Sequence, residues 1–448
     1  MAPDKVSVVC RRIGLVTSLL GPFAYGGVSP FLWPALAWLW IAIGLITIGA
    51  RQLQASPGPA PGRLLPLPLV GFYLLMMAQL VPLPAGIIRW FSSGSFAAHF
   101  LPGSVERTWA TLTVSPTGSW QALLYIAGLH GLSVALFYGA DIGTARRQLF
   151  AGMAAVGGVL ALEGLVQAQS AHPFSLYGIW KVPGIGSHER GVFGPYYNRD
   201  HYSNLIAIAG SVSAGLLGYR IKQRAFGSLK AFVGSADFSM TLALIAGLLL
   251  MMVASAASGS RGGLVAFGVG LLVAFGPAAL VRPRLALAGL IGCLVLLFAT
   301  GVPAAFARMG DADFEASRLM VWRDIARLAT FFPIFGCGIG AFAPAYWPYQ
   351  RVVRFEYWPH VHNEYLQWFI EGGALGALIA IIFLRQVWIA APRIVRSVEA
   401  RPALAGVAAG FTHALVDCTL RVPANAAWVW LLATVLFVAV APSTGEQN

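Results

Sequence analysis

The chain contains 448 residues, of which 58% are hydrophobic and only 10% are charged, with a formal net charge of +13. The surface of a soluble globular protein needs about 25% charged residues, so this composition excludes a soluble protein. The apolar residues gather into blocks close to the roughly 20 residues that an α-helix needs to cross a bilayer. None of these blocks alternates as the strands of a membrane barrel do. The sequence therefore predicts an all-α integral membrane protein.

Apolar blocks follow one another along the chain and predict about twelve transmembrane helices in a single polytopic domain, residues 1–448. The first block is interrupted by Gly21 and Pro22. The eleventh contains His413 within its apolar run and Asp417 near its end. The predicted spans are 13–30, 32–50, 66–83, 120–139, 148–168, 201–219, 238–257, 262–280, 285–302, 373–390, 403–419 and 423–441.

Basic residues lie in alternate connections between these blocks. During insertion, Lys and Arg in short loops are retained on the cytoplasmic side, which predicts that both termini are cytoplasmic. This topology accounts for more than half of the 30 basic residues, so the positive charge indicates no nucleic-acid partner. The residues concerned are Lys5, Arg11, Arg12, Arg51, Arg63, Arg146, Arg147, Arg220, Lys222, Arg224, Lys230, Arg282, Arg284, Arg385, Arg393, Arg396 and Arg401.

Three long loops fall on the opposite side of the membrane, at 84–119, 169–200 and 303–372. Loops of this length in a compact protein are usually functional, so the active residues are expected there. Of the four cysteines, only Cys337 and Cys418 fall where they could pair. They are predicted to be either a disulfide or two unpaired packing residues.

The last of these loops ends with PHVHNEYLQWFIEGGALG, residues 359–376, which leads into the tenth predicted span. Asn363 can cap a helix that starts at Glu364, which places His362 at a helix N-terminus that favours anions. A histidine there can exchange a proton at neutral pH, as an acid or as a base. Two other interpretations stay open: an interfacial histidine bonded to loop backbone, or a metal site formed by His360, His362 and Glu364.

The second long loop leads into RGVFGPYYNRDHYSN, from Arg190 to Asn204, at the entry to the sixth span. Its glycines and proline fix a tight backbone, and polar side chains reach the membrane surface at Asn198, Arg199 and His201. An arginine suits a diphosphate, because its planar fork donates paired hydrogen bonds to phosphate oxygens and stays charged. Alternatively, one or more of these arginines, above all Arg199, extend to lipid headgroups.

Two further segments carry arginines. The turn SGSRGG, residues 258–263, places Arg261 near membrane depth, where a charge is costly and indicates function rather than a headgroup contact. The segment that begins near Arg318 and includes Arg323 and Arg327 predicts an amphipathic helix on the membrane, which ends before a Pro- and Gly-rich turn. Of its three arginines, only Arg318 is a candidate substrate contact.

Taken together, these motifs resemble those of the O-antigen ligase and polymerase superfamily. In order, they are R-G-x-F-x(4)-N followed by His, S-R-G-G, R-x(3)-W ahead of P-x-F-G-x-G-x-G, and H-N-x-x-L-x(4)-E-x-G. The motifs cover roughly residues 185–376, and the pattern of spans extends the resemblance to the whole chain. Each motif alone is weakly specific, whereas their order and spacing together are specific to the superfamily rather than to one activity within it.

The resemblance implies a GT-C-like glycosyltransferase of the bacterial inner membrane that needs neither metal nor other cofactor. It would take a glycan from an undecaprenyl diphosphate carrier at the periplasmic face and join it to a hydroxyl of the lipid A core or of a growing glycan. His362 would be the general base, and Arg190 and Arg261 would bind the diphosphate, whose developing charge fixed cations stabilise. The supporting positions are Asn198, His201, Arg318, Asn363 and Glu371.

Several alternatives stay open. A carboxylate could replace His362 as the base, and Asn198 and Glu371 could serve only to fix loop and helix geometry.

The leading hypothesis for the activity is the ligase. A polymerase of the same superfamily, for O-antigen, capsule or exopolysaccharide, is second, and a protein-directed oligosaccharyltransferase is third. The carboxylates that could replace His362 as the base are Asp311, Asp313, Glu315, Glu356 and Glu364.

A transporter of lipid-linked glycan is the alternative from a different functional class. It would predict ionisable residues within the spans and a repeat between the two halves of the chain. Here the ionisable residues cluster in the outer loops, and no repeat between halves is evident. The sequence therefore favours an enzyme over a transporter.

Overall fold

The structure is a computed structural model of the chain. It describes residues 3–53, 66–100, 108–170, 175–177, 179, 192–223, 236–281, 284, 291–292, 312–351 and 358–440. Arg190 lies outside the described residues, as does the predicted ninth span, 285–302, apart from Ile291 and Gly292.

The described residues form fifteen α-helices and one two-stranded antiparallel sheet, which confirms the all-α class. Six helices are long and apolar enough to span a membrane, and three shorter apolar helices accompany them. The chain is therefore a multi-pass integral membrane protein, while the full set of twelve spans and their orientation stay predictions. The helices are α1 (Pro3–Leu20), α2 (Leu32–Gln52), α3 (Leu67–Leu80), α4 (Ala85–Phe91), α5 (Ser93–His99), α6 (Pro116–Phe137), α7 (Ile142–Ala168), α8 (Arg199–Gln223), α10 (Ala236–Ser258), α11 (Arg261–Val281), α13 (Ala312–Phe331), α14 (Phe342–Tyr346), α15 (Glu364–Arg396), α16 (Arg401–His413) and α17 (Pro423–Val440), and the strands are β1 (Leu83–Pro84) and β2 (Trp109–Ala110).

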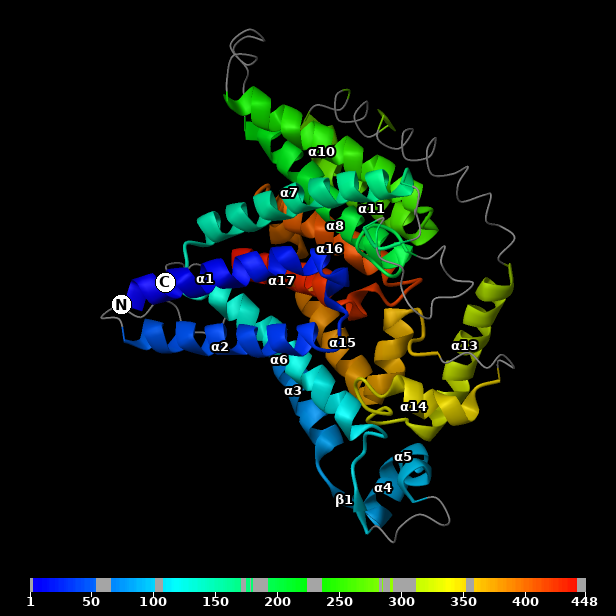
Figure 1. Ribbon diagram of the computed structural model, residues 1–448. Helices are drawn as coiled ribbons and strands as arrows, with labels where there is room; N and C mark the ends of the chain where they lie inside the picture. Colours follow the sequence, from blue (N-terminus) through cyan, green and yellow to red (C-terminus); the bar gives the residue numbers. More distant parts are fainter. Residues whose placement is uncertain are drawn as a thin grey trace.

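Helix α8 is the centre of one group of helices. Residues 202–215 of α8 are all buried, and the helix packs against α7, α10, α11 and α16 (Figure 1). Small residues allow these close contacts, because a side chain at Gly263 or Gly270 of α11 would collide with a serine of α8. The first turn of α8, which carries His201, therefore lies at the end of a closely packed group.

Helices α1, α2 and α6 form a second group, and α17 contacts both groups (Figure 1). The bounds predicted for the first span, 13–30, are wrong, because α1 runs from Pro3 to Leu20. Gly21 and Pro22, which interrupt the apolar block, end the α-helix, and the chain continues as two short 3-10 turns.

The eleventh predicted span, 403–419, is also wrong in its bounds, since α16 ends at His413. Residues 414–418 form a turn and the short 3-10 helix η6 (Thr419–Arg421) follows. A carboxylate inside a lipid-facing helix is costly, and the turn instead directs Asp417 into the protein, where it is 1% exposed.

Helix α15 is broken at Gly373, whose backbone (φ 61°, ψ −155°) is readily adopted only by glycine. The break frees backbone groups that pair with the Pro- and Gly-rich turn after α13. In this joint the Cys337 amide donates to the Ile370 carbonyl at 2.9 Å. Gln79 of α3 also donates to the Glu371 carbonyl, at 2.8 Å. The joint gives a structural reason for the glycines of the P-x-F-G-x-G-x-G and H-N-x-x-L-x(4)-E-x-G motifs, and it fixes the first half of α15.

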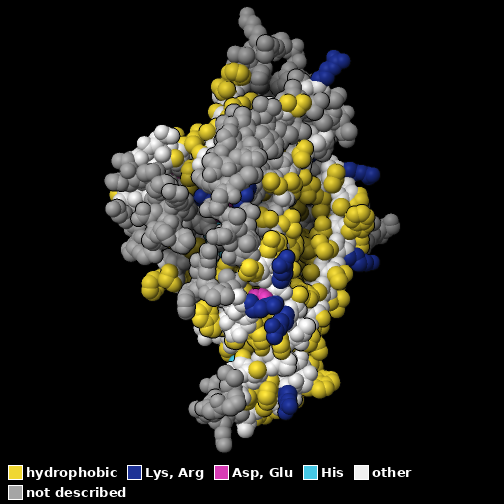
Figure 2. All heavy atoms as spheres, turned by 90° about the vertical axis from the view of Figure 1, so that its right-hand side faces the viewer, with side chains coloured by type: hydrophobic (Ala, Val, Ile, Leu, Met, Phe, Trp, Pro, Cys, Tyr) yellow, Lys and Arg dark blue, Asp and Glu magenta, His cyan; other side chains and the backbone are white. Residues whose placement is uncertain are grey.

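Helix α13 lies on the outside of the molecule, at the right of Figure 1, and confirms the helix predicted around Arg318. Its exposed side chains include Leu319 and Met320 as well as Arg323 and Arg327. Figure 2, which faces this side, shows basic side chains gathered beside an acidic one below a broad apolar surface. Such a mixed face suits a membrane interface, as the amphipathic pattern predicts.

Candidate active site

His362 lies in the turn that leads into α15. Asn363 is the N-cap of this helix, as predicted, and its Oδ1 accepts hydrogen bonds from the Tyr365 and Leu366 amides, each at 3.0 Å. His362 has a left-handed backbone, with φ +55°, which is uncommon for a residue with a side chain and needs surrounding contacts to hold it. The Trp358 ring packs edge-on against the imidazole, with ring centroids 5.6 Å apart. The imidazole is thus held in place while 15% of the side chain stays exposed.

The imidazole of His362 is paired with a carboxylate that is distant in the sequence. Nδ1 of His362 lies 2.7 Å from Oδ1 of Asp417, and the same oxygen accepts a hydrogen bond from the Cys418 amide at 2.8 Å. Burial alone would raise the pKa of Asp417, but the hydrogen bond from His362 and the neighbouring basic groups outweigh it and hold that pKa well below its usual value. The carboxylate is therefore charged at neutral pH and fixes His362 through Nδ1.

A histidine held at Nδ1 by a buried carboxylate is an arrangement that suits a general base. The carboxylate fixes the tautomer and the ring orientation, and it stabilises the imidazolium that forms when Nε2 takes a proton. Sequence reasoning missed the contact of Asp417 with His362, because it assigned the residue to the end of the eleventh span. The available signal was the presence of His413 and Asp417 in an apolar block, since ionisable residues at membrane depth indicate function by default.

The neighbouring His360 has a different environment. Its Nδ1 lies 3.3 Å from the side-chain amide of Gln367. Burial, and then the charge of Arg421, lower the pKa of His360 to about 3, so the ring is neutral at physiological pH. Glu364, the third member of the predicted metal set, is instead paired with Arg421. The side chains of this set are therefore engaged by different partners, and of the two histidines His362 is the one paired with Asp417.

A second set of ion pairs holds the start of α15, and we call Arg421, Glu364 and Glu371 the Arg421 cluster. Nε of Arg421 donates to Glu364 at 3.1 Å, and Nη2 donates to Glu371 at 2.9 Å. The Glu371 side chain is only 1% exposed. Burial would lower the pKa of Arg421, but the two carboxylates outweigh burial and raise it. Glu371 thus fixes helix geometry, while Arg421 was missed because it lies outside every motif.

Two predicted supporting residues lie at the start of α8. Asn198 caps the helix, because its Oδ1 accepts a hydrogen bond from the Asp200 amide at 2.7 Å. Nε2 of His201 lies 3.8 Å from Sγ of Cys418, which places His201 next to the His362–Asp417 pair. Asn198 therefore fixes the helix end, and His201 belongs to the site itself.

Two arginines approach the same region from α11 and α13. Nη1 of Arg318 donates to the Val416 carbonyl at 3.1 Å, one residue before the buried aspartate. Arg261 is exposed and begins α11. The next residue, Gly262, lies so close to α16 that a Cβ there would be 2.7 Å from Nε2 of His413. Predicted residues on α8, α11, α13 and α15 thus meet at one end of the bundle.

The cysteines Cys337 and Cys418 are both buried and free, so they are not bonded to each other. The thiol of Cys418 lies 4.0 Å from Nδ1 of His362. Burial raises the pKa of this thiol well above its usual value, so it is neutral at physiological pH and is not an activated nucleophile. The unpaired alternative is therefore the correct one for these two residues.

Residues 246–381 match the family model of O-antigen ligases. The matched region runs from α10 to α15 and includes Arg261, Arg318, His362 and Glu371. This part of the chain is similar to O-antigen ligases. Enzymes of the O-antigen ligase family transfer polyprenyl-diphosphate-linked glycans, so the protein is a membrane glycosyltransferase that uses such a donor. No curated protein matches the chain.

Proposed function

We propose that the protein is an O-antigen ligase, which transfers undecaprenyl-diphosphate-linked polysaccharide to a hydroxyl of the lipid A core. The reaction takes place at the periplasmic face of the inner membrane, and both termini of the single polytopic domain are cytoplasmic. The observation that carries this proposal is the 2.7 Å contact between His362 and Asp417. A sugar hydroxyl is a weak nucleophile, and a base of this kind at the acceptor removes its proton as it attacks.

In the proposed reaction, Nε2 of His362 takes the proton of the acceptor hydroxyl. The hydroxyl oxygen forms a bond to the anomeric carbon of the donor sugar. The bond from that carbon to the diphosphate oxygen breaks, and its electron pair leaves with the diphosphate. Asp417 stabilises the imidazolium that results, because its negative charge lies next to the positive charge that the proton brings.

The leaving diphosphate gains negative charge in the same step. Arg261 stands at the end of the bundle that carries the base, and we assign it, with Arg190, to the diphosphate. Fixed cations stabilise a charge that develops in the transition state more than the same group in the ground state. No metal or cofactor takes part in the proposed reaction, because the diphosphate is already an activated leaving group and the arginines supply positive charge.

The base is tested with purified protein that is given carrier-linked glycan and a rough lipopolysaccharide acceptor, with and without a chelator. His362→Ala should lower the rate of transfer roughly 100- to 10,000-fold. The matched control is His360→Ala, whose rate should stay within about fivefold of wild type, since one neutral hydrogen bond contributes about 1 kcal/mol. Equal losses in the two variants would overturn the assignment of His362.

The same assay decides the acceptor. Glycan that appears on lipopolysaccharide, with no loss of rate in the presence of chelator, supports the ligase. Lengthening of carrier-linked chains without lipopolysaccharide would show a polymerase of the same superfamily instead. Absence of transfer under every condition would contradict both activities.

The arginines are tested by replacement with Lys, which keeps the charge but loses the planar fork. Arg261→Lys and Arg190→Lys should each lower the transfer rate roughly tenfold, because one charge-assisted hydrogen bond contributes about 1.5 kcal/mol. Arg323→Lys on the exposed face of α13 serves as the control and should keep the wild-type rate. Full activity in both test variants would remove the case for forked contacts with the diphosphate.

A further inference from the structure

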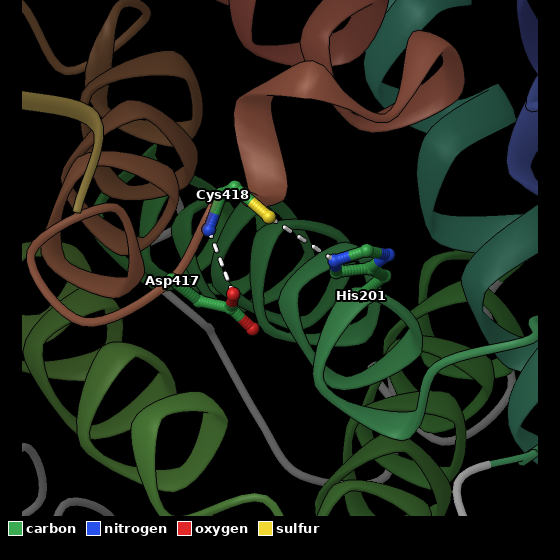
Figure 3. A group of neighbouring side chains, drawn as sticks. All are labelled: His201, Asp417 and Cys418. Carbon is green, nitrogen blue, oxygen red and sulfur yellow. Dashed lines mark hydrogen bonds between the residues drawn. The ribbon is translucent and has the colours of Figure 1, made fainter. Parts of the chain in front are cut away.

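A cluster of metal-ligand side chains surrounds Asp417 and extends beyond the pair with His362. The nitrogen, oxygen and sulfur donors of His201, Asp417 and Cys418 all lie within 4.8 Å of one another. Figure 3 shows the three side chains, with His201 on α8 facing the turn that carries the other two. Asp200, His413 and Asp417 form a second group within the same limit. Asp417 belongs to both groups, so an ion bound at either would use this carboxylate.

Two atoms of this cluster are buried without a hydrogen-bond partner in the part of the chain that the structure describes. They are Oδ2 of Asp417 and Nδ1 of His413. Both side chains are 1% exposed, so bulk water does not satisfy these atoms. A buried polar atom without a partner costs about 1–3 kcal/mol, and more when the group is charged. The carboxylate is thus bonded on one oxygen and unsatisfied on the other.

The donor set and its spacing fit one class of ion. Ligands around tetrahedral Zn²⁺ lie at about 2.0–2.3 Å from the metal, which places them roughly 3.3–3.8 Å from one another. Nε2 of His201 and Sγ of Cys418 are 3.8 Å apart. His413 and Asp417 lie one helical turn apart, since the Asp417 amide donates to the His413 carbonyl. A set with imidazole and thiol favours zinc-like ions over Mg²⁺ or Ca²⁺, which take oxygen ligands.

We propose that this cluster binds a Zn²⁺-like divalent cation through His201, Asp417 and Cys418, and that the thiol of Cys418 releases its proton to solvent when the ion binds. The ion would take Oδ2 of Asp417 while Oδ1 keeps its contact with His362. It would therefore withdraw negative charge from the carboxylate that supports the base, so that occupancy lowers the rate of glycan transfer. This consequence for the rate rests on the proposed function, whereas the binding of the ion does not.

Binding is tested on the purified full-length protein in detergent, with Zn²⁺ and with Co²⁺ as the spectroscopic probe. Elemental analysis after gel filtration should find about one Zn²⁺ per chain, and Co²⁺ should give the absorption band of a thiolate ligand. Cys418→Ser should abolish that band and weaken Zn²⁺ binding at least about tenfold, whereas Cys337→Ser should keep both. His201→Gln provides a second ligand variant, in case Cys418→Ser does not fold. Absence of retained metal, or an unchanged band in Cys418→Ser, would overturn the site.

The effect on activity is measured separately. Zn²⁺ should lower the transfer rate of wild type, a chelator should restore it, and Cys418→Ser should require more Zn²⁺ for the same inhibition. Metal binding without inhibition would leave the site in place and overturn its coupling to the base. Metal binding in a protein that shows no transfer at all would contradict the proposed function and not the site.

Discussion

The turn between α16 and α17 contacts the start of α15 through the side chains of Asp417 and Arg421. Both contacts join a buried carboxylate to a basic side chain. They differ in the basic group, which is an imidazole in one contact and a guanidinium in the other. They differ also in their surroundings. The His362 side chain is partly exposed in the turn before α15, whereas Arg421 contacts two carboxylates of α15, Glu364 and Glu371. Under the proposed function, one contact positions a base, whereas the other holds two carboxylates of one helix in place.

Asp417→Asn should break the chemical half of this comparison. Removal of the carboxylate should lower the rate of transfer roughly 100- to 10,000-fold, as the loss of an orienting carboxylate does in a catalytic triad. The amide has nearly the same shape as the carboxylate. The thermal unfolding temperature should therefore change little, while the rate falls strongly. Both are measured on the same purified sample. A variant that unfolds but keeps its rate per folded molecule would assign Asp417 to architecture.

The pH dependence of the rate sharpens the same prediction. In wild type the rate should fall at low pH, because a general base must be unprotonated to accept a proton. The low pKa of His360, about 3, keeps that ring neutral and outside this transition. Because Asp417→Asn removes a negative charge 2.7 Å from the proposed base, the acid side of the profile should move to lower pH. Rates measured between about pH 5 and 9 check this shift, and an unchanged acid side would separate Asp417 from the base.

Arg421→Met should break the architectural half. The substitution leaves the charge of Glu371 buried, with 1% of its side chain exposed. Loss of one partner from a buried ion pair costs about 3–5 kcal/mol, so the unfolding temperature should fall clearly. Arg421→Met combined with Glu371→Gln removes the buried charge and should recover part of the loss. The pH profile of any remaining activity should keep its wild-type position, and a shifted profile at unchanged stability would reverse the roles of the two contacts.

The sequence predicted most of the helices because apolar blocks end at turns, as α2 and α6 show. Local signals also located single residues correctly, since the cap by Asn363 depends only on the amides that follow it. The predicted bounds of the first and eleventh spans, which correspond to α1 and α16, were wrong for a related reason. An apolar block does not reveal where a Gly-Pro pair or a buried carboxylate ends the helix inside it.

Contacts between distant parts of the chain could not be predicted. The partner of His362 lies 55 residues further on, and its position depends on α16 ending at His413. The partner of Glu371 lies 50 residues further on, in a 3-10 turn that has no sequence signature. The motifs therefore singled out His362 and Glu371, whereas only the packing of α16 and α17 against α15 shows which partner each of them has.

Glu364→Gln is expected to have the smallest effect, and it resolves the Arg421 cluster further. Arg421 keeps its two contacts with Glu371, and the new amide oxygen can still accept from Nε. The other oxygen of Glu364 is buried without a hydrogen-bond partner among the described residues, so a neutral side chain also removes a charge that is only partly satisfied. These effects oppose each other, and the net loss of stability should be about 1 kcal/mol. Thermal unfolding measures it, and the pH profile should not move. A loss of stability larger than that of Arg421→Met would show that Glu364, rather than the more deeply buried Glu371, contributes most to the stability of the cluster.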